Sequence, residues 1–420
     1  MKRFFWCMTA GLAWQVQAQM ASPSMSTEMP DLKSLTEVVL RHNPNHLAVM
    51  QAEKQAQAGL ISAAALPNPR LELGQGQNQA RLTGTGAAVG TVQSIGWVQP
   101  IENPALRSAR FNSASAQQEW ARQQVRLLRL QLIADVEALA FEYFWRRDTA
   151  RVYREDWQLL EQVRERVRVK VESGEAARYE LIKADAEVIN ARQRFQSADV
   201  QSQQVLLTFN RLAAGQLPGL VDIQGALDQA VDMNSLLALQ DQAVQRNPEL
   251  AALRAQLTRA RHQLDLAKSQ RWPGAELRYQ QTQDPQIRQD VWGIQVQIPL
   301  LDQRRGPMAE AQAEVARLQA LVDGRTAELR QQMAQSWKAL DIARTKVSAL
   351  STGSVRVAET ALQVAQSAYR FGERGILDVL DAQRVLQSVR VDLLQARFEL
   401  QKARIDLELL SAQRLDTPTP

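Results

Sequence analysis

The chain has 420 residues, enough for a large core, and 45% of them are hydrophobic but only 5% are aromatic. This composition favours a long helical assembly over a compact enzyme. The net charge is only +5, and the acidic and basic residues are interleaved, which is typical of solvated helix faces. No basic stripe interleaved with aromatic residues indicates a nucleic-acid site.

Residues 1–18 have the pattern of a secretory signal peptide. Lys2 and Arg3 precede an apolar stretch, and Ala18 ends a small-residue cleavage motif; the alternative is a buried first helix. The only cysteine, Cys7, lies in this segment, so we expect no disulfide, cysteine metal site or catalytic thiol in the mature chain. No later stretch of 18 apolar residues predicts a membrane-spanning helix.

Residues 19–215 form the first of two predicted structural repeats. A tail rich in Met, Ser and Pro leads into a helix from about Ser34 to Leu66, interrupted at Asn43-Pro44. The tail methionines could be soft copper ligands, and His42 and His46 have a helical metal-pair spacing. The surroundings support neither site, so we expect no metal. The glycines of the loop at 79–90 resemble a phosphate loop only loosely, because their spacing is wrong.

Two strands follow, at about residues 70–77 and 91–101, each alternating apolar and polar side chains. The run from Ala105 to Ser173 then contains neither Gly nor Pro. It predicts one helix of roughly 100 Å at 1.5 Å per residue. A turn at 173–177 and a return run to Ala214 complete a long helical hairpin.

The same plan recurs after a linker at 216–234. The second repeat, 235–420, has strands at about 275–282 and 291–300, a run from Met308 to Phe371 broken only by Gly324 and Gly353, and a tip at 371–376. An offset of 198 places Gly174 on Gly372 and Glu180 on Asp378. A repeat of this length predicts pseudo-symmetry.

Both return runs carry heptads, which predict left-handed supercoiling. The a positions of the second run are Val379, Leu386, Leu393, Leu400 and Leu407, and most of its d positions are Ala. The alternative is a free-standing dimeric coiled coil, and the strands argue against it. Four strands of about ten residues each are long enough to span a bilayer when tilted. They cannot close a barrel alone, and an open edge in lipid leaves backbone groups unsatisfied, so several copies would have to share one barrel.

The motifs resemble the TolC family of outer-membrane efflux channels over nearly the whole mature length. They are the Asn-Pro helix of each half, Pro67-Asn68-Pro69-Arg70-Leu71-Glu72, and Tyr369-x-x-Gly372 followed by Asp378-Val379-Leu380-Asp381-Ala382-Gln383. Residues 171–177 and 99–102 resemble the CzcC-like heavy-metal branch.

This resemblance implies a mostly α-helical fold with a β-barrel part. It implies a homotrimer in the outer membrane of a Gram-negative bacterium, with a twelve-stranded barrel continued by a periplasmic helical barrel. It implies a passive conduit for heavy-metal cations such as cobalt, zinc or cadmium. The partners would be a periplasmic adaptor (membrane fusion) protein and an inner-membrane resistance-nodulation-division pump. No enzyme activity and no cofactor are expected. A multidrug or other solute channel and a structural trimeric rod are the alternatives.

The resemblance also implies a periplasmic gate at the hairpin tips. It places Tyr369 and Arg374 opposite Glu180, and makes Asp378 and Asp381 rings of negative charge in the pore. Tyr179 stands where the family has a small hydroxyl residue. The residues expected to contact the adaptor are Gly174, Glu175, Gly372, Glu373, Arg374 and Gly375. The alternatives are that the two aspartates only cap a helix start and that the glycines only allow tight turns.

Overall fold

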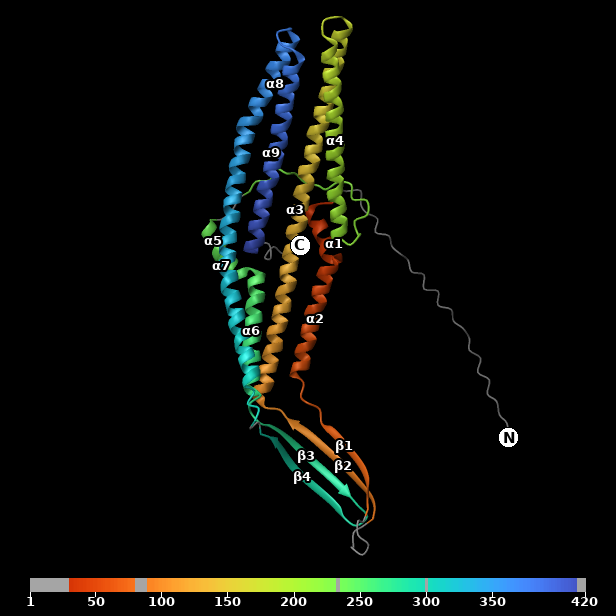
Figure 1. Cartoon of the computed structure of the whole chain (residues 1–420), viewed down its shortest axis with the longest axis vertical. Coiled ribbons are helices and arrows are strands. Elements are labelled where there is room, and N and C mark those ends of the chain that lie inside the picture. Colours follow the sequence, from red (N-terminus) through yellow and green to blue (C-terminus); the bar gives the residue numbers. More distant parts are fainter. Residues whose placement is uncertain (1–29, 80–88, 232–234, 299–300, 414–420) are drawn as a thin grey trace, which may run out of the picture.

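The computed structural model describes residues 30–79, 89–231, 235–298 and 301–413. The molecule is elongated, with helices running along most of its length and a sheet at one end (Figure 1). The predicted signal peptide, the methionine tail and most of the loop at 79–90 lie outside the described residues.

The first repeat contains two short helices, two strands and one long hairpin. Its elements are α1 (Leu32–His42), α2 (Pro44–Ala64), β1 (Arg70–Asn78), β2 (Gly90–Ile101), α3 (Pro104–Glu172) and α4 (Arg178–Leu212). Helix α3 is 69 residues long. It begins where the Asn103 side chain accepts a hydrogen bond from the Ala105 N–H (2.9 Å), with Pro104 at the first helical position, which Pro tolerates well.

The second repeat has the same order with one interruption. Its elements are α5 (Leu236–Arg246), α6 (Pro248–Ser269), β3 (Gly274–Gln283), β4 (Arg288–Gln297), α7 (Arg305–Ala349), a π-helical turn (Leu350–Ser354), α8 (Val355–Arg370) and α9 (Ile376–Ser411). Helix α7 continues through Gly324, whereas Gly353 lies in the π turn. Strand β4 begins three residues earlier than expected and ends at Gln297.

The Asn-Pro motifs have the same role in both repeats. Asn43 caps α2 by accepting from the N–H groups of Asn45 and His46, and its amide donates to the Leu212 carbonyl (3.0 Å). Asn247 caps α6 in the same way and donates to the Leu410 carbonyl (3.1 Å). Leu212 and Leu410 are related by the 198-residue offset, so each motif ties a short helix to the end of its own hairpin.

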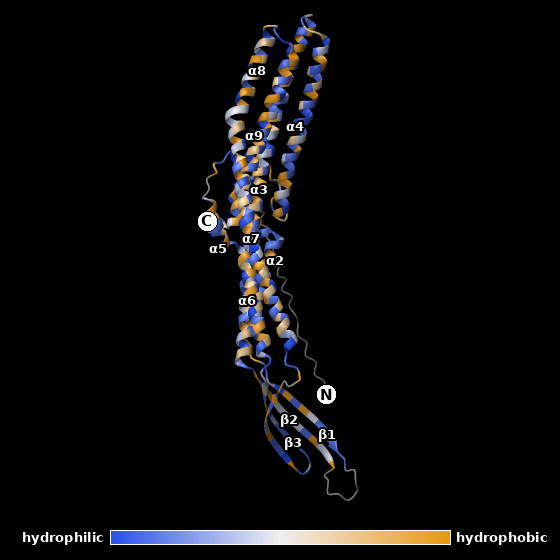
Figure 2. Cartoon of the chain, turned by 60° about the vertical axis from the view of Figure 1, so that its left-hand side comes forward, coloured by the Kyte–Doolittle hydropathy of each residue, from blue (hydrophilic) through white to orange (hydrophobic). Residues whose placement is uncertain are grey.

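The heptad seams of the return helices face the interior. On α4 the small residues Ala184, Ala191 and Ala198 are buried, and on α9 so are Val379 and Leu407. Along the helices, hydrophobic residues alternate with polar ones in narrow bands (Figure 2). Narrow seams suit helices that pack in a layer and expose the rest of their surface.

The segment between the repeats packs into the main core. Leu217, Ile223 and Leu227 are buried there among the aromatic rings of the α3 mid-section. Gly225 has a φ of +149°, and a Cβ at this position would collide with the Phe144 ring. The segment therefore covers the core instead of merely connecting the two halves.

The sheet has the strand order β1-β2-β3-β4, with antiparallel neighbours. Leu71 lies opposite Trp97, Trp97 opposite Tyr279, and Tyr279 opposite Trp292, so apolar side chains share one face. That face is exposed at Leu71, Leu73, Ile95, Trp292 and Ile294. The opposite face carries Gly96, Gly293 and Gln295 in the alternating positions. Such a large exposed apolar face marks an interaction surface.

Among the described residues, no helix is sufficiently long and apolar to cross a membrane.

Candidate functional site at the hairpin tips

Helices α8, α9, α3 and α4 lie side by side in this order and reach the end of the molecule opposite the sheet (Figure 1). Their tips form two turns of similar construction. The Glu175 N–H donates to the Lys170 carbonyl (2.8 Å), and the Glu373 N–H donates to the Ala368 carbonyl (2.9 Å). Gly174 and Gly372 have φ values of +80° and +77°, a conformation that favours glycine.

Tyr369, at the end of α8, joins the two hairpins. The Lys170 ammonium of α3 lies 4.4 Å from the centre of its ring, within the range of a cation–π interaction. Burial, and then the negative charge of Glu180, raise the pKa of Tyr369. Its hydroxyl is buried and has no hydrogen-bond partner in the described part of the chain.

Arg374, Asp378 and Asp381 have partners within their own hairpin. Arg374 lies 3.6 Å from Asp378, one turn along the chain, and within the described residues it forms no ion pair with Glu180. Asp381 pairs with Arg384 (2.9 Å), which also reaches Glu187 on α4 (2.8 Å). Arg384 therefore bridges the hairpins, a role that the sequence did not reveal because Glu187 is 197 residues away.

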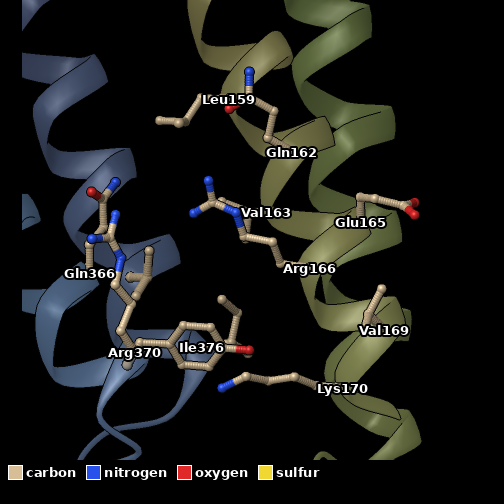
Figure 3. A pocket seen from close by; sticks show the side chains of 12 residues that line it. Leu159, Gln162, Val163, Glu165, Arg166, Val169, Lys170, Gln366, Arg370 and Ile376 are labelled. Carbon is tan, nitrogen blue, oxygen red and sulfur yellow. The ribbon is translucent and has the colours of Figure 1, made fainter. Parts of the chain in front are cut away.

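A groove of about 510 Å³ separates the hairpins near the tips (Figure 3). Its walls come from α3, α8 and the start of α9. Arg166, Lys170 and Arg370 line it, together with apolar residues such as Val163 and Ile376. The Glu165 carboxylate points away from the groove in Figure 3 and bonds to Arg168, so the charge inside the groove is positive.

Farther from the tips, a buried carboxylate ties three helices together. Asp156 of α3 has only 4% of its side chain exposed. It accepts hydrogen bonds from Gln383 of α9 (2.7 Å) and Arg194 of α4 (3.3 Å). Burial raises the pKa of Asp156, although both bonds favour its charged form. Gln383 is the last residue of the sequence motif that begins at Asp378, and the structure shows that its partner is Asp156.

Within the described ranges, no group of three or more His, Cys, Asp or Glu side chains is arranged to hold a metal ion. His46 instead bonds through Nδ1 to the Leu40 carbonyl (2.8 Å). The tip cluster of cations, carboxylates and one tyrosine has the chemistry of an adjustable ion-pair network.

Residues 239–413 match the family model described as "Outer membrane efflux protein". The chain is 23% identical over 351 residues to the cobalt-zinc-cadmium resistance protein CzcC of Cupriavidus metallidurans, covering 83% of this chain and 82% of that protein. A membrane protein from Pseudomonas aeruginosa has the same fold, with a TM-score of 0.78, 18% identity and 91% of both chains covered. CusC superposes with a TM-score of 0.78 at 16% identity, over 92% of this chain and 95% of that one.

The structural matches confirm the predicted TolC-like fold, and the family model matches the second half of the chain. The family description agrees with the predicted outer-membrane localisation.

Proposed function

Residues 239–413 belong to the outer membrane efflux protein family, and we propose that the whole chain is the outer-membrane channel of a tripartite efflux system. It is a homotrimer and a passive conduit that performs no chemistry. A periplasmic adaptor protein and an inner-membrane resistance-nodulation-division pump deliver its cargo. The observation that carries this proposal is the duplicated architecture, in which an exposed apolar sheet face stands at one end and paired hairpin tips at the other.

The gate of this channel is the tip network. Glu180, Tyr369, Arg374, Asp378 and Asp381 lie at the ends of the hairpins, where a trimer axis would bring three copies together. Buried hydroxyl groups normally have hydrogen-bond partners, so the unpartnered Tyr369 hydroxyl between the hairpins fits a contact that is remade when the tips move. The aspartates would then line the aperture and favour cations.

The adaptor binds the two tip turns, at Gly174, Glu175, Gly372, Glu373, Arg374 and Gly375. Both turns are exposed and share the backbone hydrogen bonds made by the N–H groups of their glycine and glutamate. A helical hairpin partner could therefore use one docking mode at both positions.

The cargo is proposed to be heavy-metal cations. The support is the similarity to a protein named for cobalt, zinc and cadmium resistance. A conduit needs no metal-binding cluster of its own, because selection takes place in the pump.

Single-channel conductance in planar bilayers tests the conduit and its gate. We expect low conductance for the unmodified trimer and a large increase for Arg374→Ser/Glu180→Ala. The matched control is Arg317→Ser/Glu314→Ala, which removes an exposed ion pair on α7 (2.6 Å) and should change nothing. Asp378→Asn/Asp381→Asn should shift the reversal potential in a salt gradient towards zero. A folded trimer that conducts in none of these forms would refute the conduit and support the structural rod.

The cargo is tested separately by complementing a strain that lacks its metal-efflux channel. Restored resistance to cobalt, zinc or cadmium supports the proposal. Resistance restored only towards organic compounds would instead identify a multidrug or other solute channel.

A further inference from the structure

The groove near the hairpin tips has the dimensions of a small-molecule site. Its volume of about 510 Å³ lies within the range of about 300–1,000 Å³ that is usual for such sites. It is lined by Val163 and Val169 of α3, Tyr369 of α8, and Ile376 and Val379 of α9. These side chains can bury the apolar body of a ligand.

Three cations from both hairpins also line the groove. The Arg166 and Lys170 side chains extend from α3 towards α8, which carries Arg370 (Figure 3). The Lys170 ammonium lies over the Tyr369 ring, and neither arginine forms an ion pair with another described residue. Charges of the same sign repel one another, so an anion between these cations would stabilise them.

The nearby carboxylates do not supply this anion. Among the described residues that line the groove, Glu165 alone is acidic. Its carboxylate points away from the groove (Figure 3) and accepts a hydrogen bond from Arg168 (3.1 Å). Glu180 of α4 acts on Tyr369 but does not line the groove. The groove therefore combines an apolar wall with an excess of positive charge.

We propose that this groove binds a small organic anion, with an apolar body and one carboxylate, sulfonate or phosphate group. The body packs between Val163 and Ile376, and the anionic oxygens accept hydrogen bonds from Arg166 and Arg370, because guanidinium groups match the geometry of oxyanions. Since the two arginines belong to different hairpins, the bound anion holds the hairpins in this arrangement and stabilises it by its binding free energy. The site does not depend on the proposed cargo, gate or adaptor contact.

Titration calorimetry of the full-length protein in detergent tests the site with two probes of similar shape. Naphthalene-2-sulfonate carries the anionic group, and 2-naphthalenemethanol has the same ring system without a charge. We expect the sulfonate to bind at least about tenfold more tightly, because hydrogen bonds to charged groups are the stronger ones. Equal affinities would show that the groove accepts apolar rings without regard to charge and would overturn the proposal.

Two single variants test the bridge between the hairpins. Arg166→Gln on α3 and Arg370→Gln on α8 should each weaken sulfonate binding about tenfold. Both arginines are exposed, so these substitutions should leave folding intact. The matched control is Arg164→Gln, two residues before Arg166, because Arg164 pairs with Asp185 of α4 and does not line the groove.

The variants also separate the possible failures. Equal sulfonate affinity in the unmodified protein and both variants would overturn the site. Weakening by one variant alone would overturn the bridge, because the anion would then belong to a single hairpin. Loss of binding in Arg164→Gln as well would show a general effect of surface charge and would also overturn the site. The conductance experiment described above tests the conduit independently of all these results.

Discussion

At the residue scale, Asp156 shows how one buried carboxylate can connect the two repeats. It lies on α3 and bonds to Gln383 of α9 and Arg194 of α4, while the charge of Glu187 acts against its ionisation. An ionised carboxylate out of water is costly unless it is well bonded. Its retention here suggests that it fixes the relative position of the hairpins.

The raised pKa of Asp156 makes a testable contribution to the pH dependence of stability. The folded protein holds this proton more tightly than the unfolded chain, where the pKa is about 3.9. The resulting stabilisation is present at low pH and is lost as the pH rises through the raised pKa of the folded state. Asp156→Asn removes this dependence, so wild type should exceed the variant in Tm by more at pH 4 than at pH 7. Thermal unfolding of both proteins across this range provides the measurement, and parallel curves would contradict the expectation.

The two Asn-Pro motifs allow the same experiment to be done twice in one molecule. Asn43→Ala and Asn247→Ala each remove a helix cap, worth about 0.5–2 kcal/mol. Each also leaves a carbonyl at the end of the return helix without its amide donor. We expect both variants to lower Tm, and by similar amounts because the hydrogen bonds are equivalent. The exposed Asn190→Ala on α4 is the control, and a large effect at only one motif would argue against equivalent roles.

At the element scale, the π turn distinguishes the two hairpins. Helix α3 is continuous over its whole length, whereas the corresponding run in the second repeat contains Leu350–Ser354 between α7 and α8. The hydroxyls of Ser351 and Thr352 donate to the Ser348 carbonyl (3.2 and 2.7 Å). These bonds help to satisfy the hydrogen-bonding capacity of the backbone at the wider turn. A π turn holds one residue more than an α turn, so it absorbs an extra residue that would otherwise change the facing of everything beyond it by about 100°.

Adding a residue after Gly353 should therefore be far more harmful than replacing or deleting Gly353. No atom lies within 4 Å of a Cβ built on Gly353, so Gly353→Ala should be tolerated and could add up to about 1 kcal/mol of helix propensity. Deletion of the residue would convert the turn to α-helix and keep the facing of Leu340 and Leu362. Insertion of one Ala after Gly353 would add a residue that the turn has no room to absorb, rotating α8 relative to α7 by about 100°, so that both leucines could no longer face the core. We expect the insertion variant to lose its trimer and the deletion and Ala variants to keep it, as measured by light scattering in detergent. Loss of the trimer on deletion, or its survival on insertion, would show that the turn has no role in alignment.

Much of this architecture could be predicted from the sequence, because its long elements have strong local signals. The absence of Gly and Pro predicted α3, alternation predicted the strands, and the heptads predicted the buried seams of α4 and α9. The π turn could not be predicted, since Leu350–Ser354 has no pattern that distinguishes it from an α-helix containing one glycine. The packing of Ile223 and the bridge from Arg384 to Glu187 depend on contacts between distant segments, which local patterns do not encode.

At the scale of the whole molecule, the two ends of the elongated structure have different surfaces. The hairpin tips are polar and carry ion pairs such as Arg374–Asp378. The sheet exposes Leu73, Ile95 and Ile294 on one face. If three such sheets stand in the outer membrane, the apolar face meets lipid and the alternate face meets water, so adjacent residues of one strand should respond in opposite ways to the same substitution.

Strand β4 offers that comparison in Ile294 and Gln295. Ile294 lies opposite Leu277 on the apolar face, and Gln295 lies opposite Glu276 on the other face. Arginine on a lipid-facing strand costs about 2–4 kcal/mol near the bilayer midplane, so Ile294→Arg should strongly reduce the amount of folded trimer extracted from the outer membrane. Gln295→Arg places the same charge one residue further along, in water, and should leave that amount nearly unchanged. Heat-modifiable mobility of the extracted protein on gels measures the folded fraction. Equal losses would mean that the apolar face of the sheet does not meet lipid, and greater loss from Gln295→Arg would mean that the two faces are assigned the wrong way round.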